Sequence, residues 1–456
     1  MIVMKFGGTS VESASAIERV ASIVKARLER RPVVVVSAMG KTTNKLLAMA
    51  SAAIAGHRRE ALEQLADLRA FHVREAEACV LEEDRDFVLA TLDEHFQELG
   101  ELLKGLAVLG EFTPRSVDAI SSYGERVSSF LVAHAFRKFG LPAIHVDSRS
   151  LIITDRRHSQ ALPLFHITYA KLAEAIPPLA ADRVVVMGGF IGSTEEGVTS
   201  TLGRGGSDFT ASIVGAGVGA GEIQIWTDVD GMLTADPTVF PGGYRVKTIS
   251  FEEAAELAYF GAKVLHPSTV VPAIDRKIPV LILNSRRPDA AGTRIVAESV
   301  PCRNVVKSIS CKRRITVVNI TSTRMLMAYG FLKRIFEVFE RHETSVDMLA
   351  TSEVSVSLTI DNTSRLDRIR EELKEFAQVS VETDQAIVCV VGENIRYTPG
   401  VAARVFRALN GTNIRMISQG ASRLNVGLVV AEHDLAAAVA ALHEELFEPP
   451  DPEVFE

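Results

Sequence analysis

The first two thirds of the chain alternate short apolar runs with longer segments whose apolar positions recur every three to four residues. This alternation predicts strands and amphipathic helices in turn, the order of a parallel sheet covered by helices. The expected strands are almost wholly apolar, as strands buried on both faces must be. They are Ile2–Phe6, Pro32–Ser37, Ala143–Val146, Val184–Gly188 and Ile223–Thr227. We therefore predict one mainly parallel α/β domain over residues 1–296.

After residue 303 the pattern changes to shorter units with a βαββαβ order that occurs twice. Gly330 and Gly400 each stand at an expected helix start, and Phe336 and Phe406 keep the same separation as these glycines, which indicates an internal repeat. The second copy lacks one strand, which residues 305–311 can supply. The pattern predicts two ferredoxin-like domains, at 312–384 and at 300–311 plus 385–456. Two unrelated α+β segments are the alternative interpretation.

Composition and charge narrow the class of protein. The net charge is −7, which offers no basic surface for nucleic acid or for an anionic membrane. The four cysteines show no CxxC spacing, so neither a zinc site nor a disulfide framework is indicated. The first residues run directly into a strand without a secretion signal, and no apolar run reaches the roughly 18 residues of a membrane span. We predict a cytoplasmic enzyme that acts on small molecules.

The turn Lys5-Phe6-Gly7-Gly8-Thr9-Ser10 follows the first strand and opens a helix. Backbone N–H groups at a helix start can face an anion, and Lys5 adds a full positive charge. The turn is therefore either a phosphate loop or a tight turn that needs glycine only for its backbone geometry. Local sequence leaves both interpretations open.

Two further segments carry candidate chemistry. Residues 201–208, TLGRGGSD, combine a flexible backbone with Arg204, which suits a carboxylate, and with Asp208 at a helix start. Ser207 or Asp208 can also serve only as a helix cap. Lys263 stands at the end of an apolar helix, where it is either a surface charge or a phosphate ligand.

Five sequence blocks, taken together and in order, resemble the aspartokinase family. They are KFGGTSV at 5–11, SYGERVSS at 122–129, TLGRGGSD at 201–208, WTDVDG at 226–231 and GAKVLHP at 261–267. The resemblance implies an amino-acid kinase fold, a three-layer αβα domain, followed by two ACT-like domains. It also implies transfer of a phosphoryl group from ATP to L-aspartate, giving ADP and 4-phospho-L-aspartate. Mg²⁺ would be held mainly by the ATP phosphates, with no metal site on the chain itself.

The resemblance assigns roles residue by residue. Lys5 and Asp208 would be catalytic, and substrate contacts would come from Ser37, Thr43, Glu125, Arg204 and Ser207. ATP would contact Lys5, Gly7, Gly8, Thr227, Asp228, Lys263 and Val264. The chain departs from the family at Leu233 and Thr238, where Tyr and Arg are common, which affects the expected adenine and ribose contacts.

The repeat resembles the lysine-sensitive subgroup and implies feedback inhibition in the pathway that makes lysine, threonine and methionine. An effector, L-lysine in the first instance, would bind between ACT domains of two subunits in a homodimer or homotetramer. Threonine as the effector, and the absence of any effector, remain alternatives to lysine. Ala328 stands where the subgroup has a serine. Two other functions remain as alternatives, a catalytically silent amino-acid sensor and a kinase for another amino acid. The expected effector positions are Met325, Gly330, Phe331, Leu332, Ser345, Val346, Asp347, Thr351, Ser352 and Glu353.

Overall fold

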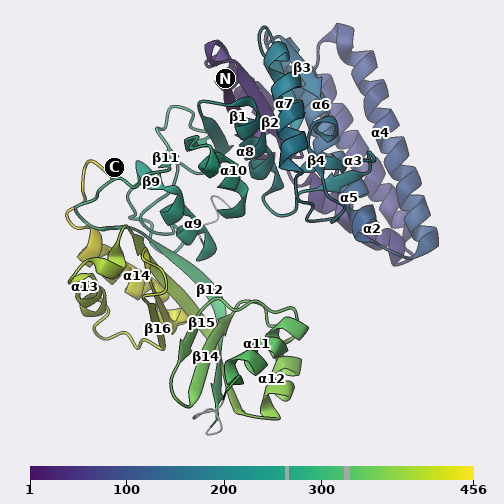
Figure 1. The fold of residues 1–456 in the computed structure, drawn as a ribbon. Helices are drawn as coiled ribbons and strands as arrows, with labels where there is room; N and C mark the ends of the chain where they lie inside the picture. Colours follow the sequence, from purple (N-terminus) through teal and green to yellow (C-terminus); the bar gives the residue numbers. More distant parts are fainter. Residues whose placement is uncertain (262–266, 323–328) are drawn as a thin grey trace. The chain divides into compact units, whose positions relative to one another are not determined.

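A computed structural model describes residues 1–261, 267–322 and 329–456 (Figure 1). The chain forms two compact units. The first comprises Met1–Met232 and Val264–Glu298, and the second comprises Leu233–Lys263 and Ser299–Glu456. The sequence predicted a first domain that is continuous to residue 296, whereas the contacts group residues 233–263 with the carboxy-terminal half.

A mainly parallel sheet forms the centre of the first unit. Its strand order is β3-β5-β2-β1-β8-β10-β11, and only β11 runs antiparallel to its neighbour β10. The five strands predicted from apolar runs are all present, within one residue of the expected bounds. The strands are β3 (Ala143–Val146), β5 (Val184–Gly188), β2 (Pro32–Val36), β1 (Ile2–Phe6), β8 (Ile223–Thr227), β10 (Val280–Asn284) and β11 (Thr293–Val296).

Helices cover both faces of this sheet, as wholly buried strands require. α1 (Ala14–Lys25) and α6 (Tyr123–Lys138) share one core cluster with β1 and β2. α7 (Phe165–Leu179) and α8 (Gly206–Val218) pack on the opposite face. A further layer outside α6 consists of α2 (Thr42–Ile54), α3 (Arg58–Cys79) and α4 (Glu82–Leu109) (Figure 1). The amino-acid kinase fold expected from the sequence is confirmed.

Shorter elements connect these layers. α5 (Pro114–Ser121) is capped by Thr113, whose side chain accepts a hydrogen bond from Ser116 N, and it leads directly into α6. A small second sheet contains β4 (Ile153–Thr154), β6 (Ile191–Thr194) and β7 (Thr199–Thr201). α10 (Val271–Asp275) precedes β10. No helix in the described residues is long and apolar enough to span a bilayer.

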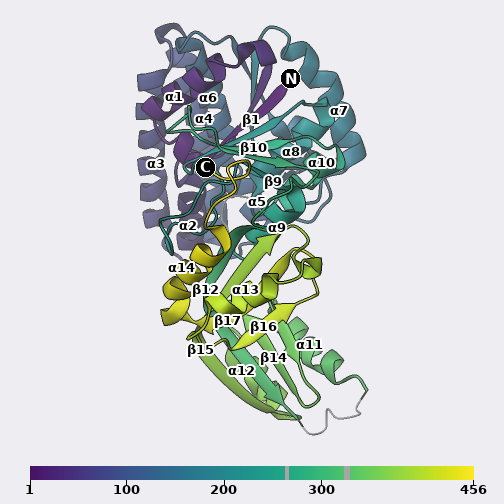
Figure 2. The ribbon, with the colours of Figure 1, turned by 90° about the vertical axis from the view of Figure 1, so that its left-hand side faces the viewer.

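The second unit is built on a six-stranded antiparallel sheet of order β13-β14-β12-β15-β17-β16 (Figure 2). Two long central strands belong to both halves of the repeat, since Ile315–Thr321 of β12 pairs with the first half of β15 and Val306–Lys312 pairs with its second half. The strand expected at 305–311 is thus part of β12 and pairs with the second half of β15. The strands are β12 (Val306–Thr321), β13 (Leu349–Thr351), β14 (Ser355–Ile360), β15 (Gln378–Gly392), β16 (Met416–Gln419) and β17 (Asn425–Ala431).

Two helix pairs pack on the two halves of this sheet. α11 (Phe331–Arg341) pairs with α12 (Leu366–Lys374), and α13 (Val401–Ala408) pairs with α14 (Leu435–Phe447) (Figure 2). The edge strand β13 begins only at Leu349, because the two preceding residues are held in another way. Asp347 N and Met348 N bond to the backbone and side chain of Thr359.

The segment 233–263 contributes β9 (Thr248–Ser250) and α9 (Phe251–Tyr259) to the second unit. Ser250 caps α9 with a full capping box, in which its side chain and that of Glu253 exchange hydrogen bonds with the backbone. Glu253 also forms an ion pair of 3.1 Å with Lys307, and both side chains are 0% exposed. These contacts join the segment to the long strand β12.

Candidate active site

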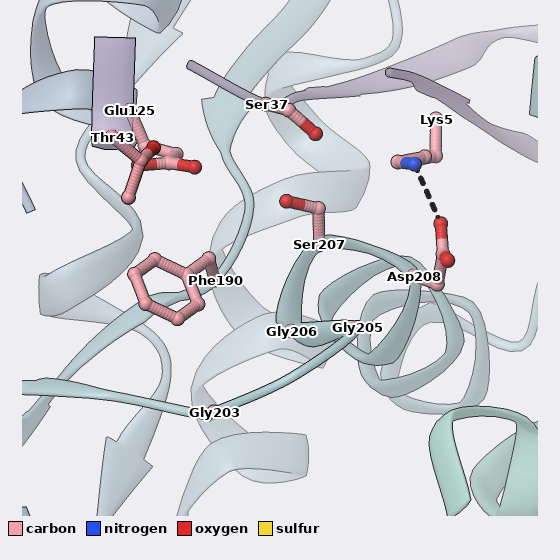
Figure 3. A pocket seen from close by; sticks show the side chains of 10 residues that line it. All are labelled: Lys5, Ser37, Thr43, Glu125, Phe190, Gly203, Gly205, Gly206, Ser207 and Asp208. Atoms are coloured by element: carbon pink, nitrogen blue, oxygen red, sulfur yellow. Dashed lines mark ion pairs between the residues drawn. The ribbon is translucent and has the colours of Figure 1, made fainter. Parts of the chain in front are cut away.

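A cavity of about 260 Å³ lies in the first unit at the carboxyl ends of β1, β2 and β5 (Figure 3). Ligands of open parallel sheets bind at this edge because loops diverge there. The lining residues are Lys5, Ser37, Thr43, Glu125, Phe190, Gly203, Gly205, Gly206, Ser207 and Asp208.

An ion pair occupies one end of this cavity. Lys5 Nζ lies 2.7 Å from Asp208 Oδ1, and the two side chains are 11% and 16% exposed (Figure 3). Lys5 belongs to β1, whereas Asp208 lies in the first turn of α8, where the helix dipole favours a negative charge. The ammonium has three donors, so the pair leaves Lys5 able to bind a further anion.

A buried carboxyl group occupies the other end. Glu125 lies in the first turn of α6 and is 4% exposed. Its Oε1 accepts a hydrogen bond of 3.2 Å from Ala38 N, while Oε2 has no hydrogen-bond partner in the described part of the chain. Burial raises the pKa of Glu125 to about 8, against the opposing effects of the bond from Ala38 and the charge of Lys5. A cationic ligand would satisfy Oε2 and favour the ionised carboxylate.

Hydroxyl groups lie between these two ends. In Figure 3, the side chains of Ser37 and Ser207 point into the space between Glu125 and the Lys5–Asp208 pair. Ser37 follows β2, and Ser207 lies in the first turn of α8. Neutral donors in this position can orient a polar ligand without adding charge.

Two glycines allow the walls of the cavity to approach one another. A Cβ at Gly8 would lie 2.8 Å from the carbonyl oxygens of Ala38 and Gly40. A Cβ at Gly189 would lie 2.6 Å from Ser207 Cβ. Both distances are too short for a side chain, so these positions need glycine for packing.

Six residues predicted from the sequence line the cavity together. They are Lys5, Ser37, Thr43, Glu125, Ser207 and Asp208. Gly7 lies in the turn after β1, where its N–H donates to Trp226 O over 3.2 Å. Gly8 begins the short 3-10 helix that continues this turn.

Other predicted residues lie elsewhere. Arg204 is exposed and does not line the cavity, although Gly203 and Gly205 on either side of it do. Thr227 and Asp228 stand at the end of β8, where the Thr227 hydroxyl donates to Asp228 over 3.2 Å. Lys263 and Val264 lie outside the described residues.

The prediction missed Phe190, which lines the cavity beside Thr43 and Glu125 (Figure 3). Its φ of 64° is rare for a residue with a side chain. Its N–H donates to Thr210 Oγ1 over 3.0 Å, and its carbonyl accepts from Leu202 N over 2.9 Å. The glycine pair that precedes it, directly after an apolar strand, was the available signal. Three glycines also line the cavity, namely Gly203, Gly205 and Gly206. The sequence indicated them only as part of the segment TLGRGGSD at 201–208 and not as individual site residues.

The expected effector residues belong to the second unit. Gly330, with φ of 80°, precedes α11, whose first residues are the buried Phe331 and the exposed Leu332. Val346 is half-buried, and Met325 lies outside the described residues. Gly330 and Leu332 are exposed, as are Ser345, Thr351, Ser352 and Glu353.

Asp347, the remaining effector position, already has partners within the chain. Lys312 Nζ lies 2.7 Å from Asp347 Oδ1 and 2.8 Å from Asp361 Oδ2. Burial raises the pKa of Asp347, with Lys312 acting against the rise. Burial acts to lower the pKa of Lys312, but its bonds to the two carboxylates outweigh that effect and raise it.

The described residues include no group of three or more His, Cys, Asp or Glu side chains arranged for a metal ion. Of the 10 residues drawn in Figure 3, Glu125 and Asp208 carry carboxylates. Mg²⁺ commonly uses one or two carboxylates together with substrate phosphates, so Asp208 beside a bound nucleotide fits such an ion.

Comparisons with known proteins show the family of the chain. Residues 1–284 match the amino acid kinase family, and residues 388–446 match an ACT domain. The chain is 39% identical to aspartokinase 2, chloroplastic, of Arabidopsis thaliana, over 98% of this chain and 84% of the relative. It is 36% identical to the lysine-sensitive aspartokinase 3 of Escherichia coli, over 98% and 99%.

Solved structures are similar over the same length. E. coli aspartokinase III in complex with aspartate and ADP matches with a TM-score of 0.83 and 35% identity, over 98% of this chain and 100% of that one. The same enzyme in complex with lysine and aspartate matches with a TM-score of 0.85 and 34% identity, over 98% and 99%. The chain therefore belongs to the aspartokinase family.

Proposed function

We propose that this kinase transfers the γ-phosphoryl group of ATP to the side-chain carboxylate of L-aspartate, and that the cavity of the first unit is its active site. The observation that carries the proposal is the arrangement of charge in one cavity. An anion-binding lysine lies at one end, and a buried carboxyl group with an unused oxygen lies at the other. A zwitterionic amino acid beside a phosphate chain complements this arrangement.

Lys5 binds the phosphates in this proposal. Phosphoryl transfer needs alignment of the reacting oxygens and neutralisation of charge rather than a strong base, because the aspartate carboxylate is already ionised. Asp208, 2.7 Å from Lys5, orients the ammonium toward the transferring group. Asp208 would also contact Mg²⁺, which supplies charge neutralisation when it is bound with ATP. Gly7, Gly8, Thr227 and Asp228, with Lys263 and Val264, are the proposed additional nucleotide contacts.

Glu125 binds the ammonium group of aspartate. Its carboxyl group is protonated in the free site at neutral pH, and it ionises when the ammonium approaches Oε2. Ser37, Thr43 and Ser207 donate hydrogen bonds to the substrate carboxylates. Arg204 stands between two glycines that line the cavity, so its guanidinium is proposed to turn inward onto a carboxylate once aspartate is bound.

The second unit is proposed to regulate this activity. The relative of known lysine sensitivity and the repeated ACT-like fold support an amino-acid effector, with L-lysine the first candidate. Lysine would bind around Asp347 and Glu353 and favour a less active state, in a homodimer or homotetramer formed through the ACT domains. Thermodynamic reciprocity requires that aspartate then weaken lysine binding. The proposed setting is the cytoplasm and the biosynthesis of lysine, threonine and methionine.

Trapping the acyl phosphate as a hydroxamate tests the proposed reaction. We expect ATP-dependent hydroxamate with aspartate and little with glutamate under the same conditions. Faster formation with glutamate would assign the chain to another amino acid. No product with either would favour the silent amino-acid sensor. An inhibition panel with lysine, threonine and methionine identifies the effector.

A further inference from the structure

The buried carboxylate of Asp118 lies outside the cavity and joins three segments of the chain that extend to the cavity. Asp118 lies in α5 and is 0% exposed. It accepts hydrogen bonds from His158 Nδ1 over 2.7 Å and from Thr201 Oγ1 over 2.5 Å. Ser159 N donates to both of its oxygens, over 2.9 and 3.1 Å. A buried carboxylate with this many donors holds its neighbours firmly, because each would otherwise lose a charge-assisted bond.

Each of the three segments leads into the active-site cavity. α5 continues into α6, which presents Glu125 in its first turn. Thr201 ends β7, two residues before Gly203, which lines the cavity. The third segment, residues 155–162, lies against this glycine, since a Cβ at Gly203 would lie 3.1 Å from Ser159 O. A second bond, from Ala161 N to Thr201 O over 2.9 Å, joins the third segment to β7.

The backbone of the third segment needs this support. Ser159 has a φ of 68°, a conformation that costs free energy in a residue with a side chain. Asp155 closes the segment on itself by accepting bonds from Arg157 N and Leu162 N. That closure fixes the internal shape of the segment, whereas Asp118 fixes its position against β7.

We infer that Asp118 is a positioning residue for the aspartate-binding end of the cavity. It sets the separation between Glu125 on α6 and the Gly203–Ser207 turn, and so the fit of an amino-acid substrate between them. The hydrogen bonds of its carboxylate involve neither Lys5 nor Asp208, so the phosphate end of the site does not depend on it in the same way. The inference rests on the proposed function, because it assigns the amino acid to the Glu125 end.

Steady-state kinetics of the full-length Asp118→Ala variant test whether Asp118 positions the aspartate-binding end of the cavity or only stabilises the fold. We expect the KM for aspartate to rise at least tenfold, because a displacement of about 1 Å in a binding residue can cost 10²-fold in rate. The KM for ATP should stay within twofold. Asp118→Asn should recover most of the loss, because its side-chain oxygen can accept from Ser159 N and Thr201 and its amide can bond to His158 Nδ1.

Leu92→Ala is the matched control. Leu92 is a fully buried core residue of α4 that neither lines the cavity nor bonds to Asp118, so its truncation lowers stability without removing a bond of the Asp118 cluster. An equal rise in the KM for aspartate in Leu92→Ala, or an unchanged KM in Asp118→Ala, would overturn the inference. If Asp118→Ala fails to fold, Thr201→Val decides, since it removes one donor to Asp118. A threefold or larger rise in the KM for aspartate then supports the inference, and a smaller change overturns it.

The activity of the wild-type enzyme distinguishes a failure of the proposed function from a failure of the positioning role. Absence of aspartate phosphorylation by the wild type would contradict the proposed function itself. Normal wild-type activity together with an unaltered Asp118→Ala would contradict only the positioning role.

Discussion

The two units each contain a lysine–carboxylate pair with the same N–O distance, 2.7 Å, and the surroundings of the pairs differ. Lys5 has one carboxylate partner and faces a cavity. Lys312 lies between two carboxylates, Asp347 and Asp361. Distance alone therefore does not assign a role to such a pair. Spare donors and open space make Lys5 suitable for binding a further ligand, whereas Lys312 already neutralises the two acids beside it.

A third lysine–carboxylate pair, Lys307 with Glu253, serves as a reference for the other two because both of its side chains are fully buried. Lys307→Met leaves Glu253 buried without its cation, and we expect it to lower the free energy of unfolding by about 3–5 kcal/mol. Urea denaturation of the full chain measures the loss. The double variant Lys307→Met/Glu253→Gln should recover part of it. If Lys307→Met is as stable as the wild type, the buried pair does not contribute to the stability of the fold.

Removal of the lysine in the cavity should affect catalysis rather than folding. We expect Lys5→Ala or Asp208→Ala to lower kcat by about 10²–10³-fold, because each removes charge stabilisation of the transferring phosphoryl group. The melting temperature should change little. Lys104→Ala is the control, since Lys104 forms an exposed pair of 2.7 Å with Glu101 on α4. Near-normal turnover in either active-site variant would remove that residue from the mechanism.

The raised pKa of Glu125, about 8, makes aspartate use depend on pH. Aspartate requires the ionised form, so kcat/KM for aspartate should rise about tenfold from pH 6 to pH 7 and level off above pH 8. Glu125→Gln should be slow at all these pH values and lack this rise. A wild-type profile that is flat between pH 6 and pH 8 would contradict the assignment.

The free energy of unfolding should fall as pH rises, opposite to the rise expected for kcat/KM. Because the folded-state pKa of Glu125 lies above its ordinary value of 4.5, the folded protein holds a proton that the unfolded chain has released. This contribution to stability is present below about pH 4.5 and is lost as pH rises toward 8. Relative to Glu125→Gln, the wild type should therefore become less stable over that interval. Melting curves of the two proteins at pH 5 and pH 8 measure the difference.

Removal of the internal cation beside Asp347 should have the smallest effect. Lys312→Met frees Asp347 for an effector ammonium, and we expect the inhibition constant for lysine to fall about fivefold, the equivalent of a partly exposed pair worth about 1 kcal/mol. Lys374→Met, which breaks an exposed pair with Glu371, should leave inhibition unchanged. Weaker inhibition in Lys312→Met would mean that Lys312 supports the effector site instead of competing for it.

The central strands and the residues at their carboxyl ends could be predicted from the sequence. Lys5 and Ser37 follow apolar runs directly, and parallel strands bring their ends to one edge. The orientation of Arg204 could not be predicted, because it depends on a turn between two glycines. The Lys312–Asp347 pair was also missed, since it joins residues 35 apart through the register of an antiparallel sheet. Asp118 was missed because its partners lie far along the chain, His158 and Ser159 in a loop 40 and 41 residues away and Thr201 in a strand 83 residues away.

The proposed function requires that the cavity of the first unit, and not Asp347 of the second, binds the substrate aspartate. Calorimetric titration of aspartate into the wild type, Glu125→Gln and Asp347→Asn, each with a non-hydrolysable ATP analogue, separates the two sites. We expect at least tenfold weaker binding in Glu125→Gln and unchanged binding in Asp347→Asn. Unchanged binding in Glu125→Gln, or a loss confined to Asp347→Asn, would contradict it.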